Sequence, residues 1–220
     1  MDLFPANPQA LYDRLFAVYG PQGWWPAETV MGMMVGAILV QNTTWIQASR
    51  AVDVLAFQGA LTPEAIRRVE DETLWEWIRP AGFFRVKAKR LKSLAHFLGQ
   101  YEDNLEILFD RDTVTLRQLL LSINGVGKET ADCILCYGAK RPQFVVDAYT
   151  SRLLSRLNWV EEDSGYDEIQ NLLQGGVPRD ADLLGEYHAL IVRHAKEHCR
   201  AKPLCPGCPL SFCPSHPKRG

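Results

Sequence analysis

The chain lacks any apolar stretch approaching the roughly 20 residues that a membrane-spanning helix needs. Its first residues, Met1–Pro5, carry neither the basic nor the apolar segment of an export signal. Hydrophobic residues make up 47% of the sequence and charged residues 23%, which is typical of globular proteins. We therefore expect a cytoplasmic protein with no membrane partner, in a reducing setting where disulfides are disfavoured.

Strand patterns are almost absent, since Phe144-Val145-Val146 is too short to predict a sheet. We find no internal repeat and no low-complexity tract. Apolar residues instead recur at helical spacing along most of the chain, which predicts an all-α fold. Thr62 is expected to cap one helix, with Pro63 at its first position. The other expected helices are residues 8–19, 29–40, 44–56, 71–78, 85–98, 113–122, 128–137, 148–157, 164–173 and 181–198.

A large excess of positive charge is also missing, because the net charge is −2. The distribution of charge is more informative than the sum. Positive residues gather in two groups, which are Arg85, Lys87, Lys89, Arg90 and Lys92, then Arg193, Lys196, Arg200 and Lys202. Each group alone could be a solvated helix face. Because the two groups flank a glycine turn between helices, we favour a surface that binds a polyanion.

The glycine turn is Gly125-Val126-Gly127, between an apolar helix and a helix that begins at Lys128. Glycine allows backbone conformations barred to other residues and lets another surface come close. The first turn of the following helix has backbone N–H groups without intrahelical partners, which bind anions. Glycine turns are common, but this one predicts a phosphate contact to a nucleic-acid backbone, with Lys128 beside it.

Cysteine is concentrated near the C-terminus, where Cys199, Cys205, Cys208 and Cys213 have the spacing C-x5-C-x2-C-x4-C. This proline-rich segment has too few apolar residues to hold itself together, so we expect a metal centre to fix it by direct ligation. Zinc remains an alternative, although structural zinc sites usually separate two knuckles by a longer loop. One compact run of four thiolates suits a [4Fe–4S] cluster better. Cys133 and Cys136 lie on an apolar helix and are expected to be buried thiols.

Together, the glycine turn, the run Phe144-Val145-Val146-Asp147 and the cysteine loop resemble the helix-hairpin-helix DNA glycosylases of the endonuclease III group. The resemblance covers about residues 29–213. It implies a six-helix lobe at 28–140 that contains the hairpin at about 120–137. It also implies a second lobe from residues 1–27 and 141–220, with a [4Fe–4S] loop at 199–213 and a DNA cleft between the lobes. Two cysteine gaps are one residue shorter than in the family's pattern.

The family places a catalytic aspartate at the start of the helix that follows the short apolar run, and Asp147 matches it. A helix N-terminus favours an ionised carboxylate. Such a carboxylate stabilises the cationic sugar that forms when a glycosidic bond breaks, and it can orient water. Taken alone, Asp147 would be a simple N-cap.

Glu129 departs from the family pattern. Family members that also cleave the DNA strand have a lysine there, which attacks the sugar and forms a Schiff base. Glu129 cannot form an imine, and Lys128, one residue earlier, is rotated by about 100° around the helix. The sequence therefore predicts a monofunctional glycosylase, in which water ends on the sugar.

The loss of the lysine nucleophile also narrows the range of expected substrates. Trp24, Trp25 and the corner Val40-Gln41-Asn42-Thr43 resemble the endonuclease III-like 3-methyladenine DNA glycosylases, in which paired aromatics stack on an extruded alkylated purine. Trp45 could join this base pocket. Alternatively, the tryptophans form a hydrophobic lid on the core. Gln41 falls where the family fills the gap left by the extruded base, although it could be only a turn residue.

The predicted function is base excision from double-stranded DNA that contains a damaged base, by a monomer that works on the nucleoid if the source is bacterial. The predicted DNA-binding residues are Gly125, Val126, Gly127, Lys128, Gln41, Lys87, Lys89 and Arg90. Alternative functions are a glycosylase for oxidised or deaminated pyrimidines or for mismatched thymine, a non-catalytic module that binds damaged DNA, and a redox sensor built around the cluster.

Overall fold

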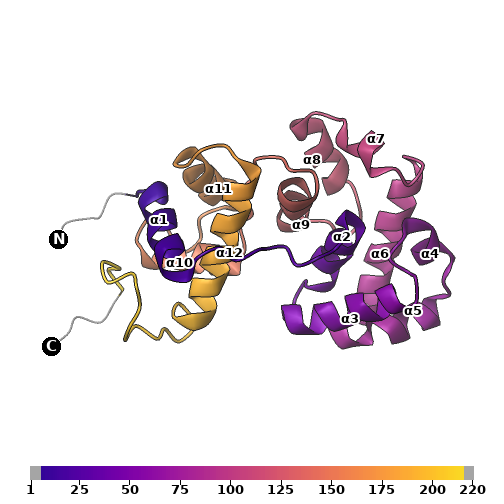
Figure 1. Cartoon of the computed structure of the whole chain (residues 1–220), viewed down its shortest axis with the longest axis horizontal. Coiled ribbons are helices and arrows are strands. Elements are labelled where there is room, and N and C mark those ends of the chain that lie inside the picture. The colour runs from indigo at the N-terminus through magenta and orange to yellow at the C-terminus, as the bar shows by residue number, and fades with distance from the viewer. Residues whose placement is uncertain (1–5, 216–220) are drawn as a thin grey trace. The chain divides into compact units, whose positions relative to one another are not determined.

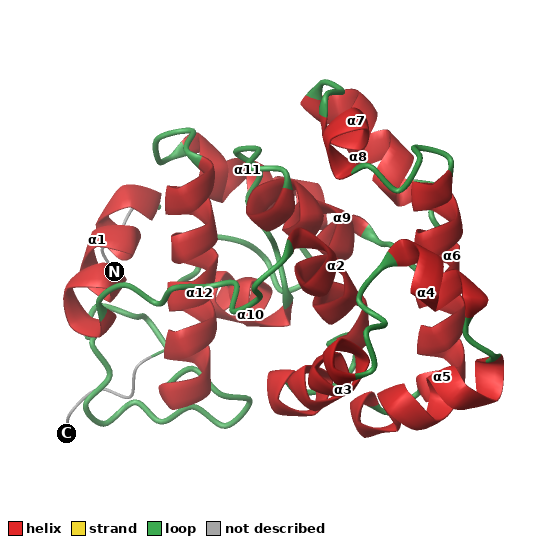
Figure 2. Cartoon of the chain, turned by 45° about the vertical axis from the view of Figure 1, so that its right-hand side comes forward, coloured by secondary structure: helices red, strands yellow, loops and turns green. Residues whose placement is uncertain are grey.

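The computed structural model describes residues 6–215, which form helices and loops and no strand (Figure 2). The prediction of an all-α fold is confirmed. None of the helices in this range is long and apolar enough to cross a membrane. The chain divides into two compact units, which are residues 1–24 with 140–220, named here the terminal unit, and residues 25–139, named here the central unit.

The terminal unit pairs a helix from the start of the chain with helices from its end. Helix α1 (Pro8–Tyr19) packs against α12 (Ala181–Glu197), which also packs against α10 (Ala148–Arg156). Figure 1 shows the indigo α1 beside the orange α12. The remaining helix, α11 (Tyr166–Gly175), contacts α1. At the core, the fully buried Tyr187 ring makes edge contacts with the rings of Tyr12 and Phe144.

The central unit is built around α2 (Val30–Leu39), in which every residue from Met31 to Leu39 is buried. A helix that is apolar on all sides has to be enclosed by others. It contacts α3 and α6, and also the helical segments at residues 128–133 and 134–138. The further elements are α3 (Trp45–Phe57), α4 (Pro63–Arg68), α5 (Asp71–Ile78), the 3₁₀-helix η1 (Arg79–Ala81), α6 (Phe84–Gly99) and α7 (Leu105–Phe109).

Helix starts follow the expected capping chemistry. The Thr62 hydroxyl accepts a hydrogen bond from Ala65 N at 3.2 Å, and Pro63 occupies the first helical position, as predicted. Thr29 caps α2 in the same way, with its hydroxyl 3.0 Å from Gly32 N. These polar residues satisfy backbone donors that would otherwise lack partners at the first turn.

The hairpin consists of α8 (Thr113–Leu121) and α9 (Lys128–Cys133). The sequence predicts one α-helix over residues 128–137, but from Ile134 to Gly138 the chain forms a π-helix, η2, closed by a bond from Ala139 N to Ile134 O at 2.9 Å. A side-chain carbon at Gly138 would lie 2.6 Å from the Met33 methyl group. The wider turn thus ends at a glycine against which α2 packs directly.

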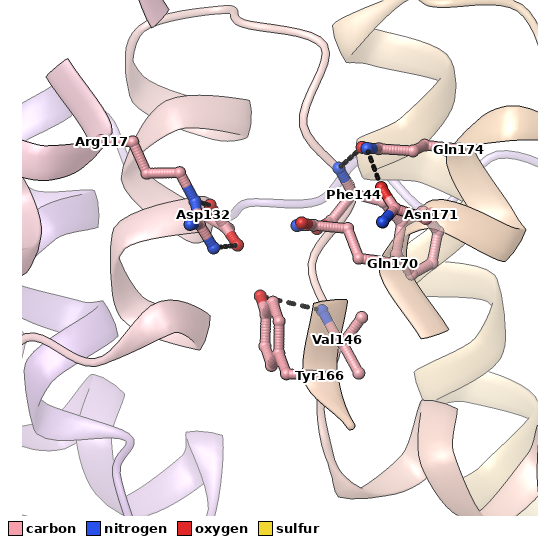
Figure 3. Close-up of polar contacts among 8 residues, drawn as sticks. All are labelled: Arg117, Asp132, Phe144, Val146, Tyr166, Gln170, Asn171 and Gln174. Carbon is pink, nitrogen blue, oxygen red and sulfur yellow. Dashed lines mark hydrogen bonds and ion pairs between the residues drawn. The ribbon is translucent and has the colours of Figure 1, made fainter. Parts of the chain in front are cut away.

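A buried ion pair joins the two hairpin helices (Figure 3). Arg117 on α8 donates from Nε to Asp132 Oδ1 at 2.7 Å and from Nη2 to Asp132 Oδ2 at 2.9 Å. The Asp132 side chain is fully buried. A two-point contact of this kind fixes the orientation of both groups. It therefore sets how α9 leaves the glycine turn.

Replacing Asp132 with asparagine should lower the free energy of unfolding by about 3–5 kcal/mol, because it leaves the Arg117 charge without its buried partner. Urea unfolding measures this loss. The matched control is Asp182→Asn in the exposed pair with Lys140, which should cost less than about 1 kcal/mol. Equal effects of the two substitutions would contradict the assigned role of Arg117–Asp132.

Candidate active site and nucleic-acid interface

The glycine turn before α9 brings its backbone close to α6. Gly125 has φ 89°, a conformation that favours glycine. A side-chain carbon there would lie 2.2 Å from Arg90 Cγ, so the Arg90 side chain lies directly over the turn. Gly127 is exposed and provides no side-chain cap to α9, and Lys128 and Glu129 are exposed in the first turn of that helix. The turn and the start of α9 therefore present backbone, one lysine and one glutamate at the surface.

Gln41 joins the corner after α2 to this turn. Its Nε2 donates to Gly125 O at 3.0 Å and to Thr130 Oγ1 at 2.9 Å, and its Oε1 accepts from Arg90 Nη1. The structure thus brings together Gln41, Arg90 and the hairpin. All of them belong to the central unit. The DNA contacts predicted for these residues stay a prediction.

Two predicted DNA contacts need correction. Lys87 is buried on α6, where its Nζ donates to Leu39 O at 2.9 Å and to Ala81 O at 2.7 Å. Burial lowers the pKa of Lys87 to about 8. Val126 is buried as well, and its N–H donates to Ile123 O within the turn. Because both side chains are buried, neither Lys87 nor Val126 can reach a phosphate. Lys87 instead holds the end of α2, and Val126 shapes the turn. Lys89, in contrast, is exposed.

Phe83 is a surface residue that the sequence analysis missed. It is 69% exposed and has φ 44° just before α6. A bulky residue in the left-handed region is strained, and such strain gathers at functional sites. The available signal was Gly82-Phe83-Phe84, an aromatic pair after a glycine at the head of a basic helix. An exposed aromatic side chain in the unit that contains the hairpin could contact bases.

The tryptophans occupy different surroundings. In the central unit, the rings of Trp25 and Trp45 meet edge to face with centroids 5.1 Å apart, and Tyr137 lies 5.6 Å from Trp25. A side-chain carbon at Gly36 would be 3.2 Å from the Trp45 ring, so this aromatic group packs on α2. Trp24 falls in the terminal unit. The group of Trp25, Trp45 and Tyr137 is half-buried, and its role as a base pocket stays a prediction.

Side chains from α11 hold the extended run before Asp147. Gln174 Oε1 accepts from Phe144 N at 3.3 Å, and Gln170 Nε2 donates to Phe144 O at 2.6 Å. One turn earlier on α11, the Tyr166 hydroxyl accepts from Val146 N at 3.3 Å. These residues recur every four positions on one helix face (Figure 3). They satisfy buried backbone groups that have no strand partner, and they fix the path of the chain into Asp147.

Asp147 is the N-cap of α10, and its side chain is 12% exposed. Its Oδ1 accepts from Thr150 N at 2.8 Å and from Thr150 Oγ1 at 2.9 Å, while its Oδ2 lies 3.4 Å from His188 Nε2. Burial works to raise the pKa of Asp147, but the contacts with His188 and Thr150 outweigh it and hold the pKa below its usual value. The carboxylate is therefore anionic at neutral pH, as the helix N-terminus predicts.

All four cysteines of the C-terminal loop line one cavity, together with Arg156, His194 and His198. Arg156 Nη1 donates to Cys199 Sγ at 3.2 Å. In residues 6–215 no three His, Cys, Asp or Glu side chains converge tightly enough to hold a single ion. Four thiols around a shared cavity still fit a cluster, because each can ligate a different iron. Cys133 and Cys136 are buried, as predicted.

Comparison with known proteins identifies the family. The model of the HhH-GPD superfamily base excision DNA repair proteins matches residues 35–179. A protein of Methanocaldococcus jannaschii, provisionally named a DNA repair glycosylase, is 49% identical over 206 residues, which are 92% of this chain and 94% of that protein. Endonuclease III of Sulfolobus acidocaldarius is 30% identical over 183 residues, covering 82% of this chain and 79% of that protein. The chain belongs to the HhH-GPD superfamily of base excision DNA repair proteins.

Solved structures agree with this assignment. The 3-methyladenine DNA glycosylase of H. pylori bound to 1,N6-ethenoadenine has a TM-score of 0.74 at 28% identity, with 86% of this chain and 95% of that chain covered. A trapped covalent complex of endonuclease III with DNA has a TM-score of 0.81 at 23% identity, with 94% of each chain covered. The second likeness shows the fold alone.

Proposed function

We propose that this repair protein is a monofunctional DNA N-glycosylase that hydrolyses the bond between sugar and base in double-stranded DNA at alkylated purines such as 3-methyladenine. The observation that carries the proposal is Asp147, a mostly buried carboxylate that its contacts hold anionic at the head of α10. An anion fixed in this way stabilises a sugar that becomes cationic as the base leaves. Because it is pre-oriented, it needs little rearrangement during the reaction.

The identity of residue 129 supports the monofunctional reaction. Glu129 occupies the second position of α9, where an acidic side chain is favourable next to the helix N-terminus. A carboxylate cannot attack the sugar carbon and form an imine, so no lyase step runs through this position. Water then completes the reaction, and the DNA strand stays intact at the abasic site.

The choice of an alkylated purine rests on two further observations. The aromatic group of Trp25, Trp45 and Tyr137 offers electron-rich ring faces, which attract a positively charged base. The structurally similar H. pylori enzyme is a 3-methyladenine DNA glycosylase. The identity to endonuclease III of S. acidocaldarius supports a second candidate, a glycosylase for oxidised or deaminated pyrimidines.

Mass analysis of the bases released from methylated DNA tests the substrate and the reaction together. We expect free 3-methyladenine and strand breaks that need added alkali. Asp147→Asn should keep its affinity for DNA and lose on the order of 100-fold or more in the rate of base release.

Release of pyrimidines alone from a panel of single-lesion duplexes would favour the second candidate. Strand cleavage without alkali would contradict the proposal that an enzyme with Glu129 has no lyase step. No base released from any lesion would leave a non-catalytic module that binds damaged DNA.

The contact with DNA is proposed to involve phosphates around the hairpin, with Lys89, Lys128 and the Gly127 backbone as donors and Phe83 as an apolar contact. Such binding should be independent of sequence and should weaken steeply as salt increases. Replacing Lys89 or Lys128 with alanine should each reduce the slope of log affinity against log salt by about 1. The matched control is Arg68→Ala on α4, an exposed cation paired with Glu64. An unchanged slope would remove Lys89 or Lys128 from the interface.

A [4Fe–4S] cluster is the cofactor that we propose for the cysteine loop. Cys199, Cys205, Cys208 and Cys213 would hold it, and its iron–thiolate bonds would fix a loop with little apolar packing of its own. Arg156 supports the same loop, since it donates to Arg200 O at 2.6 Å and to Ala201 O at 2.9 Å besides the Cys199 sulfur.

Purified protein should contain about four iron atoms and four sulfides per chain. Cys205→Ser should lose most of this iron, whereas Cys136→Ala, which removes a thiol buried in η2, should retain it. Elemental analysis and the visible absorbance measure the difference. Stoichiometric zinc in protein produced with iron available would contradict the proposal.

A further inference from the structure

The two carboxylate oxygens of Asp147 have different partners. Oδ1 is held from within α10 by the backbone N–H and the hydroxyl of Thr150. Oδ2 lies 3.4 Å from His188 Nε2, which comes from α12. The first contact is the ordinary capping of a helix. The second joins the cap to a separate helix, and capping does not require it.

His188 is itself fixed by the core of the terminal unit. It is 6% exposed, and its ring meets the Phe144 ring edge to face with centroids 6.4 Å apart. The preceding residue, Tyr187, is fully buried between the rings of Phe144 and Tyr12. A side chain packed in this way has few alternative rotamers. His188 can therefore hold the Asp147 carboxylate in one orientation.

We propose that His188 is a positioning residue for Asp147 and fixes the orientation of the carboxylate through Oδ2. This inference rests on the proposed glycosylase function. A proton on Nε2 would point toward Oδ2 across the 3.4 Å between the two atoms, whether or not the ring is charged. Thr150 holds one oxygen and His188 lies against the other, so both contacts favour one orientation of the carboxylate.

Among the groups that lower the pKa of Asp147, His188 is the one that comes from another helix. Within α10, Thr150 contributes only hydrogen bonds. From α12, the His188 imidazole lies 3.4 Å from Oδ2, and this contact lowers the pKa of Asp147. The neighbouring groups from α1 face Tyr187 instead. The Tyr12 ring contacts the Tyr187 ring, and burial and then the Asp13 charge raise the pKa of Tyr187. Loss of the imidazole should therefore raise the pKa of Asp147.

Two substitutions separate positioning from packing. His188→Phe keeps an aromatic ring and loses the donor, while His188→Gln keeps an N–H donor. Tyr187→Phe is the matched control on the same helix, because the buried Tyr187 hydroxyl has no hydrogen-bond partner in the part of the chain that the structure describes. Single-turnover release of 3-methyladenine from methylated DNA gives the rate, and a duplex with a tetrahydrofuran abasic analogue gives the affinity.

We expect His188→Phe to slow base release on the order of 10- to 100-fold, since small misplacements of a reacting group have effects of this size. Its affinity for the abasic duplex should be unchanged. The acid limb of its rate profile should move to higher pH, because Asp147 then protonates at higher pH. His188→Gln should restore most of the rate, and Tyr187→Phe should match the wild type.

A wild-type rate and acid limb in His188→Phe would overturn the proposal, and so would equal losses in the Phe and Gln variants. If His188→Phe does not fold, ¹⁵N NMR of the wild-type imidazole decides, since a proton on Nδ1 alone contradicts donation to Asp147. Failure of the proposed glycosylase function gives a different result from failure of the proposal for His188. In that case the wild type releases no base, or Asp147→Asn releases it at the wild-type rate.

Discussion

The chain around Asp147 is arranged to keep a mostly buried carboxylate anionic. Burial works to raise the pKa of Asp147, so the contacts around it have to favour the charged form. The α10 N-terminus, the two donors of Thr150 and the His188 imidazole provide this stabilisation. The side chains of α11 hold the extended run that leads into the cap. Much of the terminal unit thus serves to place one negative charge.

In the central unit, contacts within the protein likewise hold the hairpin surface in place. Gly125 and Gly127 let backbone reach the surface at the hairpin, and Arg117–Asp132 fixes the angle between the helices. Gln41 and Arg90 tie the turn to α2 and α6. This part of the unit is therefore ordered by contacts within the protein itself. A preformed surface loses little conformational entropy when it binds a ligand.

The sequence predicted what depends on local chemistry. Helical periodicity identified most helices, capping residues identified their starts, and Asp147 was found as an N-cap after a short apolar run. What it missed depends on contacts between distant residues. Lys87 belongs to a basic group by sequence, yet its ammonium binds two carbonyls in the interior. The support that α11 gives to Phe144 and Val146 joins residues 20 to 30 positions apart, and no local pattern predicts it. The η2 turn ends at Gly138, which packs directly against the distant Met33.

In the proposed reaction an anion stabilises the sugar, and no amine attacks in its place. Incubation with methylated duplex DNA and sodium borohydride tests this directly, because the reagent converts any Schiff base into a permanent protein–DNA link. An endonuclease III, which has been trapped covalently on DNA, is the positive control. We expect released base and no cross-linked species from this protein. A cross-link formed in proportion to the released base would contradict it.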